Sequence, residues 1–217
     1  MTTTLLLLRH AHTEANEHGS TPRMAGWCDI PLSERGEIQL DALRRVSLGE
    51  LAPLVYSSTS PRAMCTAAAV ARGRSVVPLR SLREIACGDV DGWLITDVAR
   101  RHPDLWRRNL AQDDPDFCWP GGESYRSLRA RVLRALRGLS ARHRGARVLV
   151  VTHAGPVAQV VGHIEGVSPA RWECYRPANA SITTVACDDD GTMRLLELDR
   201  RIVPDVTLAA DAGRRGG

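Results

Sequence analysis

The chain has 217 residues and a mass of 23.7 kDa, with 43% hydrophobic and 25% charged residues, which is typical of a globular protein with a substantial core. Aromatic residues make up only 4%, and the formal net charge is only +4. Both values argue against a nucleic-acid-binding surface, which needs stacking platforms or a strong basic patch. All 29 basic residues are arginine, which excludes catalysis by a Schiff-base lysine or a phosphate-loop lysine.

The sequence indicates neither a membrane span nor secretion. The apolar run at residues 5–8 is too short to cross a bilayer, and no basic segment precedes it as in a signal peptide. The six cysteines are widely scattered, without a C-x-x-C pair or the compact cysteine and histidine spacing of a zinc site. We therefore interpret them as small apolar residues, expect no bound metal, and predict a cytoplasmic protein.

Short apolar runs alternate with amphipathic segments along most of the chain. In chain order the predicted elements are a strand at 5–8, a helix at 32–45, a strand at 54–56, a helix at 62–71, a strand at 76–79, a helix at 123–142, a strand at 148–151, a helix at 154–162, and a hairpin of strands at 181–186 and 193–198. Strands that alternate with helices form a parallel sheet covered on both faces. We predict an α/β fold, a three-layer sandwich whose largely parallel central sheet has about six strands.

Residues 93–120 do not fit this alternation. We interpret them as a small cap inserted into a single domain of residues 1–208. The last residues, 209–217, are predicted to form a flexible tail.

Charged side chains follow the predicted strands where each strand ends. Arg9 and His10 come directly after the first strand, and His153 comes directly after the fourth. Arg62 lies beyond the second strand and Glu84 beyond the third. Ligands of parallel α/β sheets bind at this edge, and arginines and histidines there would bind a tetrahedral dianion. Each residue alone has a simpler structural explanation, so only their joint placement predicts a site.

Six motifs, in order along the chain, resemble those of the histidine phosphatase superfamily, the group that includes the cofactor-dependent phosphoglycerate mutases. They lie at residues 9–11, 26–36, 57–67, 84–92, 121–124 and 151–155. They look most similar to the small-molecule phosphatases of the family, including the α-ribazole-phosphate phosphatases. The chain departs from the family pattern at three positions. Ala11 and Ala154 stand where the family usually has glycine, and His12 stands where glutamate or glutamine is common. None of these departures removes a residue that carries out chemistry.

The resemblance implies a catalytic set of His10, Glu84, His153, Arg9 and Arg62. His10 would be the nucleophile, because one ring nitrogen of a neutral imidazole can carry a phosphoryl group while the other donates to a carbonyl, here near Ala11. The two arginines and the second histidine would bind the phosphoryl oxygens. Glu84 would protonate the leaving alkoxide and then deprotonate the attacking water. If Glu84 is not the acid, Asp89 or Asp91 is the next candidate.

Further residues of the same loops are predicted to contact the substrate. They are Asn16, Thr13, Ser57, Arg23, Trp27, Thr152 and Ala154. Ser57 and Thr152 could equally cap strand ends, and Trp27 could equally be a packing residue.

These residues predict a phosphomonoesterase that hydrolyses a small-molecule phosphate monoester through a covalent phosphohistidine, with no metal and no cofactor. Two alternatives share the site, a phosphoglycerate mutase and a catalytically inactive binding protein. The modest cap and the lack of lysine favour hydrolysis over a mutase, and the complete catalytic set argues against an inactive protein. We expect no nucleic-acid or membrane partner. The sequence leaves open whether the chain forms a homodimer and which phosphate ester it uses.

Overall fold

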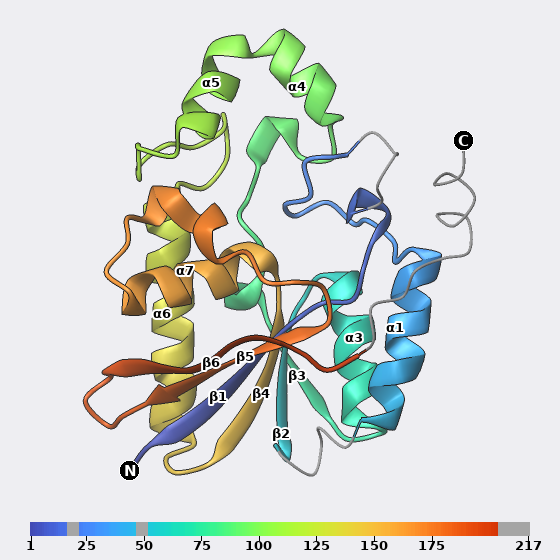
Figure 1. The fold of residues 1–217 in the computed structure, drawn as a ribbon, viewed down its shortest axis with the longest axis vertical. Coiled ribbons are helices and arrows are strands. Elements are labelled where there is room, and N and C mark those ends of the chain that lie inside the picture. The colour runs from blue at the N-terminus through green and yellow to red at the C-terminus, as the bar shows by residue number, and fades with distance from the viewer. Residues whose placement is uncertain (17–21, 47–51, 204–217) are drawn as a thin grey trace, which may run out of the picture.

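A six-stranded sheet forms the centre of the computed structural model, which describes residues 1–16, 22–46 and 52–203. Its strands are β1 (Thr3–Arg9), β2 (Leu54–Ser58), β3 (Val76–Leu79), β4 (Arg147–Thr152), β5 (Ser181–Cys187) and β6 (Met193–Arg201). They lie in the order β3-β2-β4-β1-β5-β6 (Figure 1). The first four strands pair in parallel, and β5 and β6 complete one edge antiparallel. The largely parallel sheet and its terminal hairpin are therefore confirmed.

Helices cover both faces of this sheet. The four that do so are α1 (Glu34–Arg45) and α3 (Pro61–Ala71) on one face, and α6 (Tyr125–Arg142) and α7 (Ala154–Ile164) on the other (Figure 1). Leu6 and Leu8 of β1 belong to the core with α1 and α3, while Leu5 and Leu7 belong to the core with α6 and α7. A strand buried on both faces must be apolar throughout, which is why the run at 5–8 predicted it. The three-layer sandwich is confirmed.

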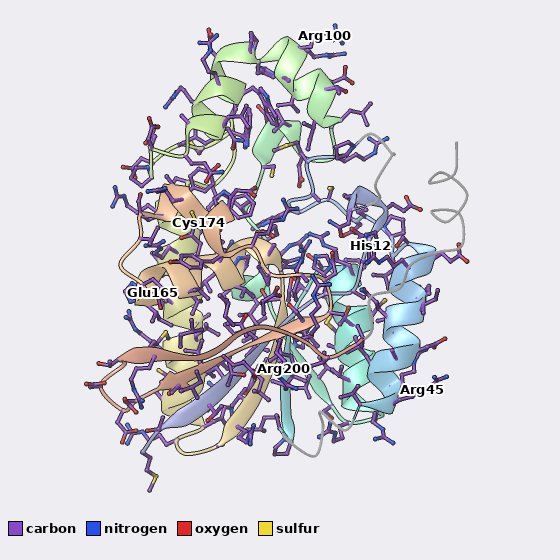
Figure 2. All side chains as sticks on the ribbon, viewed as in Figure 1. His12, Arg45, Arg100, Glu165, Cys174 and Arg200 are labelled. Atoms are coloured by element: carbon purple, nitrogen blue, oxygen red, sulfur yellow. The ribbon has the colours of Figure 1, made fainter. Side chains whose placement is uncertain are left out.

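The loop that follows β1 is held against the start of α1. Ser33 caps the helix, because its hydroxyl accepts a hydrogen bond from the Gly36 amide at 3.2 Å. The same hydroxyl lies 2.8 Å from His12 Nδ1, and the His12 amide donates to Gln39 Oε1 at 2.8 Å. His12 therefore lies beside α1 (Figure 2), where its contacts fix the loop that begins with His10.

Residues 93–120 lie beyond the carboxyl ends of the parallel strands (Figure 1). They contain α4 (Ile95–Arg101) and α5 (Pro103–Ala111). Side chains of this segment pack with Val90, Tyr125 and Ala170 in a core of their own, separate from the two that flank the sheet. The segment therefore faces the sheet edge where the predicted site lies.

Two predictions concern other parts of the chain. The tail at 209–217 lies outside the described residues. Within the described ranges, no helix combines the length and the apolar character needed to cross a membrane.

Candidate active site

The carboxyl ends of β1 and β4 bring two histidines together. The two strands are neighbours, with Arg9 opposite Thr152, and the His10 amide donates to the Thr152 carbonyl at 2.9 Å. A histidine follows each strand, and the rings of His10 and His153 meet edge to face with centroids 5.1 Å apart. Both side chains are buried. The structure thus brings together the histidines that the sequence assigned to one sheet edge.

His10 is held as a neutral imidazole. Its Nδ1 lies 2.7 Å from the Ala11 carbonyl oxygen. Because a carbonyl oxygen only accepts, Nδ1 carries the proton and Nε2 keeps its lone pair. Burial, and then the positive charges of Arg62 and Arg9, lower the pKa of His10 well below its ordinary value. Nε2 is therefore available to attack phosphorus at neutral pH.

Three buried nitrogens near His10 have no hydrogen-bond partner in the described part of the chain. They are Arg9 Nε, Arg62 Nε and His153 Nδ1. Both Nη atoms of Arg62 donate to backbone carbonyls, Nη2 to Gly26 at 2.8 Å and Nη1 to Cys28 at 2.9 Å, and Nη1 of Arg9 donates to the Pro177 carbonyl at 2.6 Å. A buried polar group without a partner costs free energy. Three such groups near the His10 imidazole are suited to bind an anion.

Burial disfavours the positive charges of this site. Burial, and then the charge of Arg176, lower the pKa of Arg9 to about 10, so the group remains a cation at neutral pH. Burial also lowers the pKa of Arg62. Burial, followed by the charge of Arg62, lowers the pKa of His153 well below its ordinary value. A bound dianion would neutralise the two arginines and raise the pKa of His153, because an anion favours the protonated imidazole.

His153 is oriented by Ser58, a residue that the sequence analysis missed. His153 Nε2 lies 2.8 Å from Ser58 Oγ, which leaves Nδ1 as the nitrogen without a partner in the described residues. Ser57, the serine that was predicted to contact substrate, instead donates to the carbonyl of Ser58 at 2.9 Å. Neighbouring residues of a strand point to opposite faces. The serine pair was a visible signal, but which serine faces His153 depends on how β2 lies against β4.

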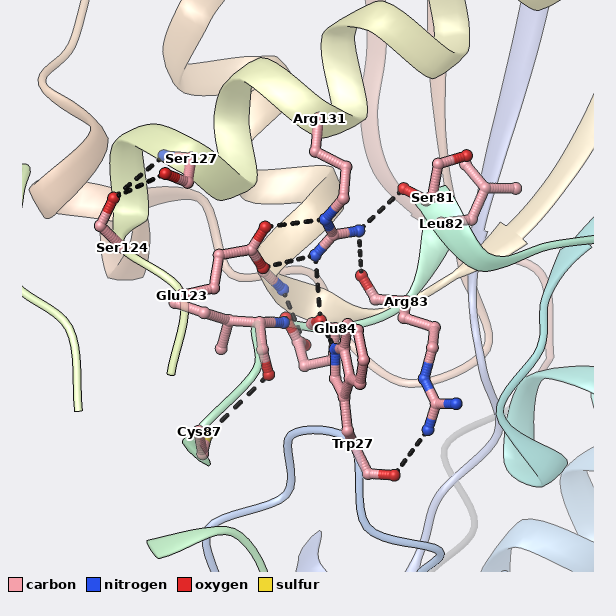
Figure 3. A network of polar contacts seen from close by, with 12 residues as sticks. Trp27, Ser81, Leu82, Arg83, Glu84, Cys87, Glu123, Ser124, Ser127 and Arg131 are labelled. Atoms are coloured by element: carbon pink, nitrogen blue, oxygen red, sulfur yellow. Dashed lines mark hydrogen bonds and ion pairs between the residues drawn. The ribbon is translucent and has the colours of Figure 1, made fainter. Parts of the chain in front are cut away.

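Glu84 is fixed through both its side chain and its backbone. Its Oε1 accepts from the Ile85 amide at 2.9 Å, and its Oε2 accepts from the Gly155 amide, in the first turn of α7, at 3.0 Å. Its carbonyl accepts from Trp27 Nε1 at 2.8 Å and from Arg131 at 3.1 Å (Figure 3). The carboxyl group of the predicted proton donor therefore has a defined place.

Arg131 of α6 anchors the segment that leads to Glu84. Its guanidinium forms a two-point ion pair with Glu123, at 2.8 and 2.6 Å, and also donates to the carbonyls of Ser81 and Arg83 at 2.8 and 3.0 Å (Figure 3). The pair is mostly buried, with exposed fractions of 21% and 15%. The sequence analysis missed Arg131, because it is one of several arginines on an amphipathic helix and no local signal distinguishes it.

Asp91 shapes the loop that holds Arg62. Its carboxylate accepts hydrogen bonds from the amides of Gly26, Trp27 and Cys28 at 2.9, 2.6 and 2.7 Å. The carbonyls of Gly26 and Cys28 in turn accept from Arg62. Asp91, one of the two alternative proton donors suggested by the sequence, is thus engaged in holding this loop.

Four of the five predicted catalytic residues line one cavity of about 650 Å³. They are Arg9, His10, Arg62 and Glu84, and the ring of His153, which is not among the described lining residues, packs edge to face on His10. The cavity is also lined by residues from the 93–120 segment and from the region around Trp172. Among the described residues, no group of three or more histidine, cysteine, aspartate or glutamate side chains is placed to hold a metal ion.

Four of the predicted substrate contacts also line this cavity. They are Thr13, Asn16, Arg23 and Ala154. Asn16 Oδ1 accepts from the Thr13 hydroxyl at 2.9 Å, and Arg23 donates to the Gly92 carbonyl at 2.9 Å. Asn179, which the sequence analysis missed, donates to the His10 carbonyl at 3.1 Å and lies 3.3 Å from Asn16 Oδ1. It precedes β5, and only the pairing of β5 with β1 brings it here.

The other three predicted contacts are not among the described residues that line the cavity. They are Ser57, Thr152 and Trp27. The Thr152 hydroxyl donates to the Leu82 carbonyl at 2.7 Å. The guanidinium groups of Arg80 and Arg83 stack on the Trp27 ring, 4.7 and 4.9 Å from its centroid. The three side chains have partners within the protein, and their contact with substrate stays a prediction.

Known proteins resemble the chain over most of its length. The family model for the histidine phosphatase superfamily (branch 1) matches residues 5–199. Phosphoserine phosphatase 1 of Hydrogenobacter thermophilus is 30% identical over 187 residues, which cover 85% of this chain and 87% of that protein. The metal-independent phosphoserine phosphatase of Arabidopsis thaliana is 30% identical over 191 residues, 86% of this chain and 77% of that protein. The α-ribazole phosphatase structure from Shigella flexneri shares the fold, with a TM-score of 0.75, 23% identity, and coverage of 94% of this chain and 100% of that one.

Proposed function

The chain belongs to the histidine phosphatase superfamily (branch 1), and on that premise we propose that it hydrolyses a small-molecule phosphate monoester through a phosphohistidine on His10. One observation carries the proposal. The bare Nε2 of a neutral imidazole lies beside three buried nitrogens that have no partner in the described chain. Phosphoryl transfer needs such a set, a nucleophile for the phosphorus atom and fixed donors for its oxygens.

In the first step, the lone pair of His10 Nε2 forms a bond to phosphorus while the bond from phosphorus to the ester oxygen breaks. Arg9 and Arg62 stabilise the charge on the phosphoryl oxygens, and His153 donates to another oxygen from Nδ1. Glu84 enters the step protonated and gives its proton to the leaving alkoxide. The products of this step are phosphorylated His10, the free alcohol and the Glu84 carboxylate.

In the second step, water replaces the alcohol. The Glu84 carboxylate takes a proton from the water as its oxygen bonds to phosphorus, and the bond between phosphorus and Nε2 breaks. This step returns His10 to its neutral form, reprotonates Glu84 and releases inorganic phosphate. The positive charge comes from arginine, so the proposed reaction uses no metal ion, as the name of the Arabidopsis relative states for that enzyme.

Turnover of p-nitrophenyl phosphate in the presence of EDTA tests this proposal. We expect hydrolysis without added metal, and rapid quenching should trap an acid-labile, base-stable phosphoryl adduct. His10→Ala should abolish both signals, while His102→Ala, which changes a histidine of the 93–120 segment, should retain both. A strict requirement for added metal, or an adduct in His10→Ala, would overturn the mechanism. Release of phosphate without a bisphosphate primer separates hydrolysis from the mutase alternative.

We propose that residues 93–120 act as a cap over the bound substrate, since side chains of this segment line the cavity. We also propose a cytoplasmic location, supported by six cysteines that are all unpaired in the described structure. That the chain forms a homodimer stays a prediction, which light scattering of the purified protein tests.

A further inference from the structure

The aromatic residues of this protein are concentrated at one place. The chain holds nine tryptophan, tyrosine and phenylalanine residues, and five of them line the cavity above the nucleophile. These five are Trp106, Phe117, Trp119, Tyr125 and Trp172. In a chain so poor in aromatic residues, this concentration indicates that the cavity receives an apolar group.

The aromatic side chains form a preorganised surface. Phe117, Trp119 and Tyr125 are buried, and the ring of Phe117 contacts both others, with centroids 5.2 Å from Trp119 and 5.9 Å from Tyr125. Trp106 stacks on Trp119 with centroids 6.4 Å apart. Rings that hold one another in place lose little freedom when a ligand packs on them, so the contact area contributes to affinity.

Four charged side chains line the same cavity away from the phosphate end, and three of them, Glu123, Glu173 and Arg176, form ion pairs within the protein. Glu123 is paired with Arg131 at 2.6 Å, Glu173 lies 3.6 Å from Arg176, and Arg23 donates to a backbone carbonyl. An ammonium or carboxylate group on the leaving alcohol would have to compete with these partners. A charge that enters a largely apolar cavity without a free partner loses its hydration at a cost.

We propose that the preferred substrate is the phosphate monoester of an uncharged alcohol that carries a planar aromatic or similarly apolar group. This inference rests on the proposed function of the same site. The phosphate would lie against Arg9, His10 and Arg62, and the apolar body of the alcohol would pack on the aromatic surface. Monoesters of charged amino acids or hydroxy acids would be poorer substrates. The inference separates this chain from its relatives that are named phosphoserine phosphatases.

A series of four alkyl monoesters tests the inference, since each has an aliphatic alcohol as leaving group. The esters are 2-phenylethyl phosphate, ethyl phosphate, O-phosphoserine and 3-phosphoglycerate. We expect kcat/KM for 2-phenylethyl phosphate to exceed that of each of the other three by about tenfold or more, as for other hydrophobic pockets that distinguish substrates by their apolar groups. Titration of the inactive His10→Ala protein with the same esters should give the same order of affinities without turnover.

Variants of two tryptophans from the same segment provide a matched pair. Trp106→Ala should reduce the ratio of kcat/KM between 2-phenylethyl and ethyl phosphate toward one, and Trp106→Leu serves if the alanine variant does not fold. Trp93→Ala removes a tryptophan that packs on His102, with ring centroids 5.9 Å apart, and that is not among the described cavity-lining residues. It should keep the wild-type ratio.

The outcomes distinguish the inference from the proposed function. A preference for O-phosphoserine or 3-phosphoglycerate, or equal rates for the phenylethyl and ethyl esters, overturns the substrate class but leaves a phosphomonoesterase. Failure to hydrolyse all four esters and p-nitrophenyl phosphate overturns the proposed function, and the substrate class with it.

Discussion

The amide of Gly155 donates a hydrogen bond to Glu84 Oε2 at 3.0 Å, and a Cβ atom on Gly155 would lie 2.1 Å from Glu84 Oε1. Only glycine allows this approach, because any side chain would occupy the place of the carboxyl group. The contact joins the first turn of α7 to the segment after β3, 71 residues apart in the sequence. It defines where the proposed proton donor stands relative to His10.

Gly155→Ala should therefore displace Glu84 and lower kcat/KM for alkyl phosphates by about 10²-fold, within the usual contribution of general acid catalysis. Gly138→Ala is the matched control, because it also replaces a helical glycine. The new methyl group would have no neighbouring atom of another part of the described chain within 4 Å. The control should retain activity and be more stable by about 0.5–1 kcal/mol in urea unfolding. Equal activity of the two variants would show that Glu84 does not need this contact.

Glu84→Gln should slow the phosphorylation step far more for alkyl phosphates than for p-nitrophenyl phosphate. An alkoxide needs a proton as it leaves, while a nitrophenolate does not, and a general acid contributes ~10²–10⁴-fold. Because Glu84 also acts as the base of the second step in the proposed mechanism, single-turnover burst measurements must isolate the first step. Equal losses for both leaving groups would assign Glu84 to structure or binding.

Ser58→Ala should lower kcat/KM about tenfold, because His153 loses the partner that orients its ring and a buried nitrogen is left unsatisfied. Ser57→Ala removes the neighbouring hydroxyl, which donates only to a local carbonyl at 2.9 Å, and should have a much smaller effect. Urea midpoints of both variants separate lost orientation from lost stability. The reverse order of activities would contradict the role given to Ser58.

Asp91→Asn should weaken phosphate binding, because its carboxylate holds three amides of the loop whose carbonyls anchor Arg62. We expect KM to rise and inhibition by inorganic phosphate to weaken by about tenfold, with a smaller change in kcat, as when binding common to the ground and transition states is lost. Asp89→Asn, at a carboxylate that lies next to Gly121, is the control. A fall in kcat with unchanged phosphate inhibition would instead point to Asp91 as a participant in proton transfer.

The two site histidines should make the protein less stable in mild acid. Their pKa values in the folded chain are lowered, first by burial and then by the charge of Arg62, whereas histidines of the unfolded chain titrate near 6.5. Below about pH 6.5 the unfolded state therefore binds more protons than the folded state. As the pH decreases, the free energy of unfolding decreases by up to ~1.4 kcal/mol per pH unit for each of the two histidines. Urea titrations at pH 7.5, 6.5 and 5.5 measure this slope.

His10→Asn provides the control for the pH dependence. It removes one of the two buried groups, so the slope between pH 6.5 and 5.5 should decrease relative to the wild type. An unchanged slope would show that His10 takes up its proton in the folded chain as readily as in the unfolded one.

Features that depend on neighbours in the sequence could be predicted from the sequence alone. An apolar run predicted β1, which is buried on both faces. His10 follows this strand, and the carbonyl that accepts from its Nδ1 belongs to the next residue, Ala11. Alternation of strands and helices predicted the sheet, because crossover connections make neighbouring strands parallel. The ends of parallel strands share one edge, so Arg9, His10 and His153 were expected together before any distance was known.

Only the tertiary structure decided which side chains support these residues. Ser58 contacts His153 across 95 residues of sequence, and Arg131 of α6 reaches the Glu84 carbonyl. Such contacts depend on strand order and on the packing of α6 against the sheet, which arise from the sum of many weak contacts and have no local pattern. The aromatic surface over the nucleophile has the same origin, since Trp106 and Trp172 meet in one cavity only after the 93–120 segment and the region before β5 have folded over the same sheet edge.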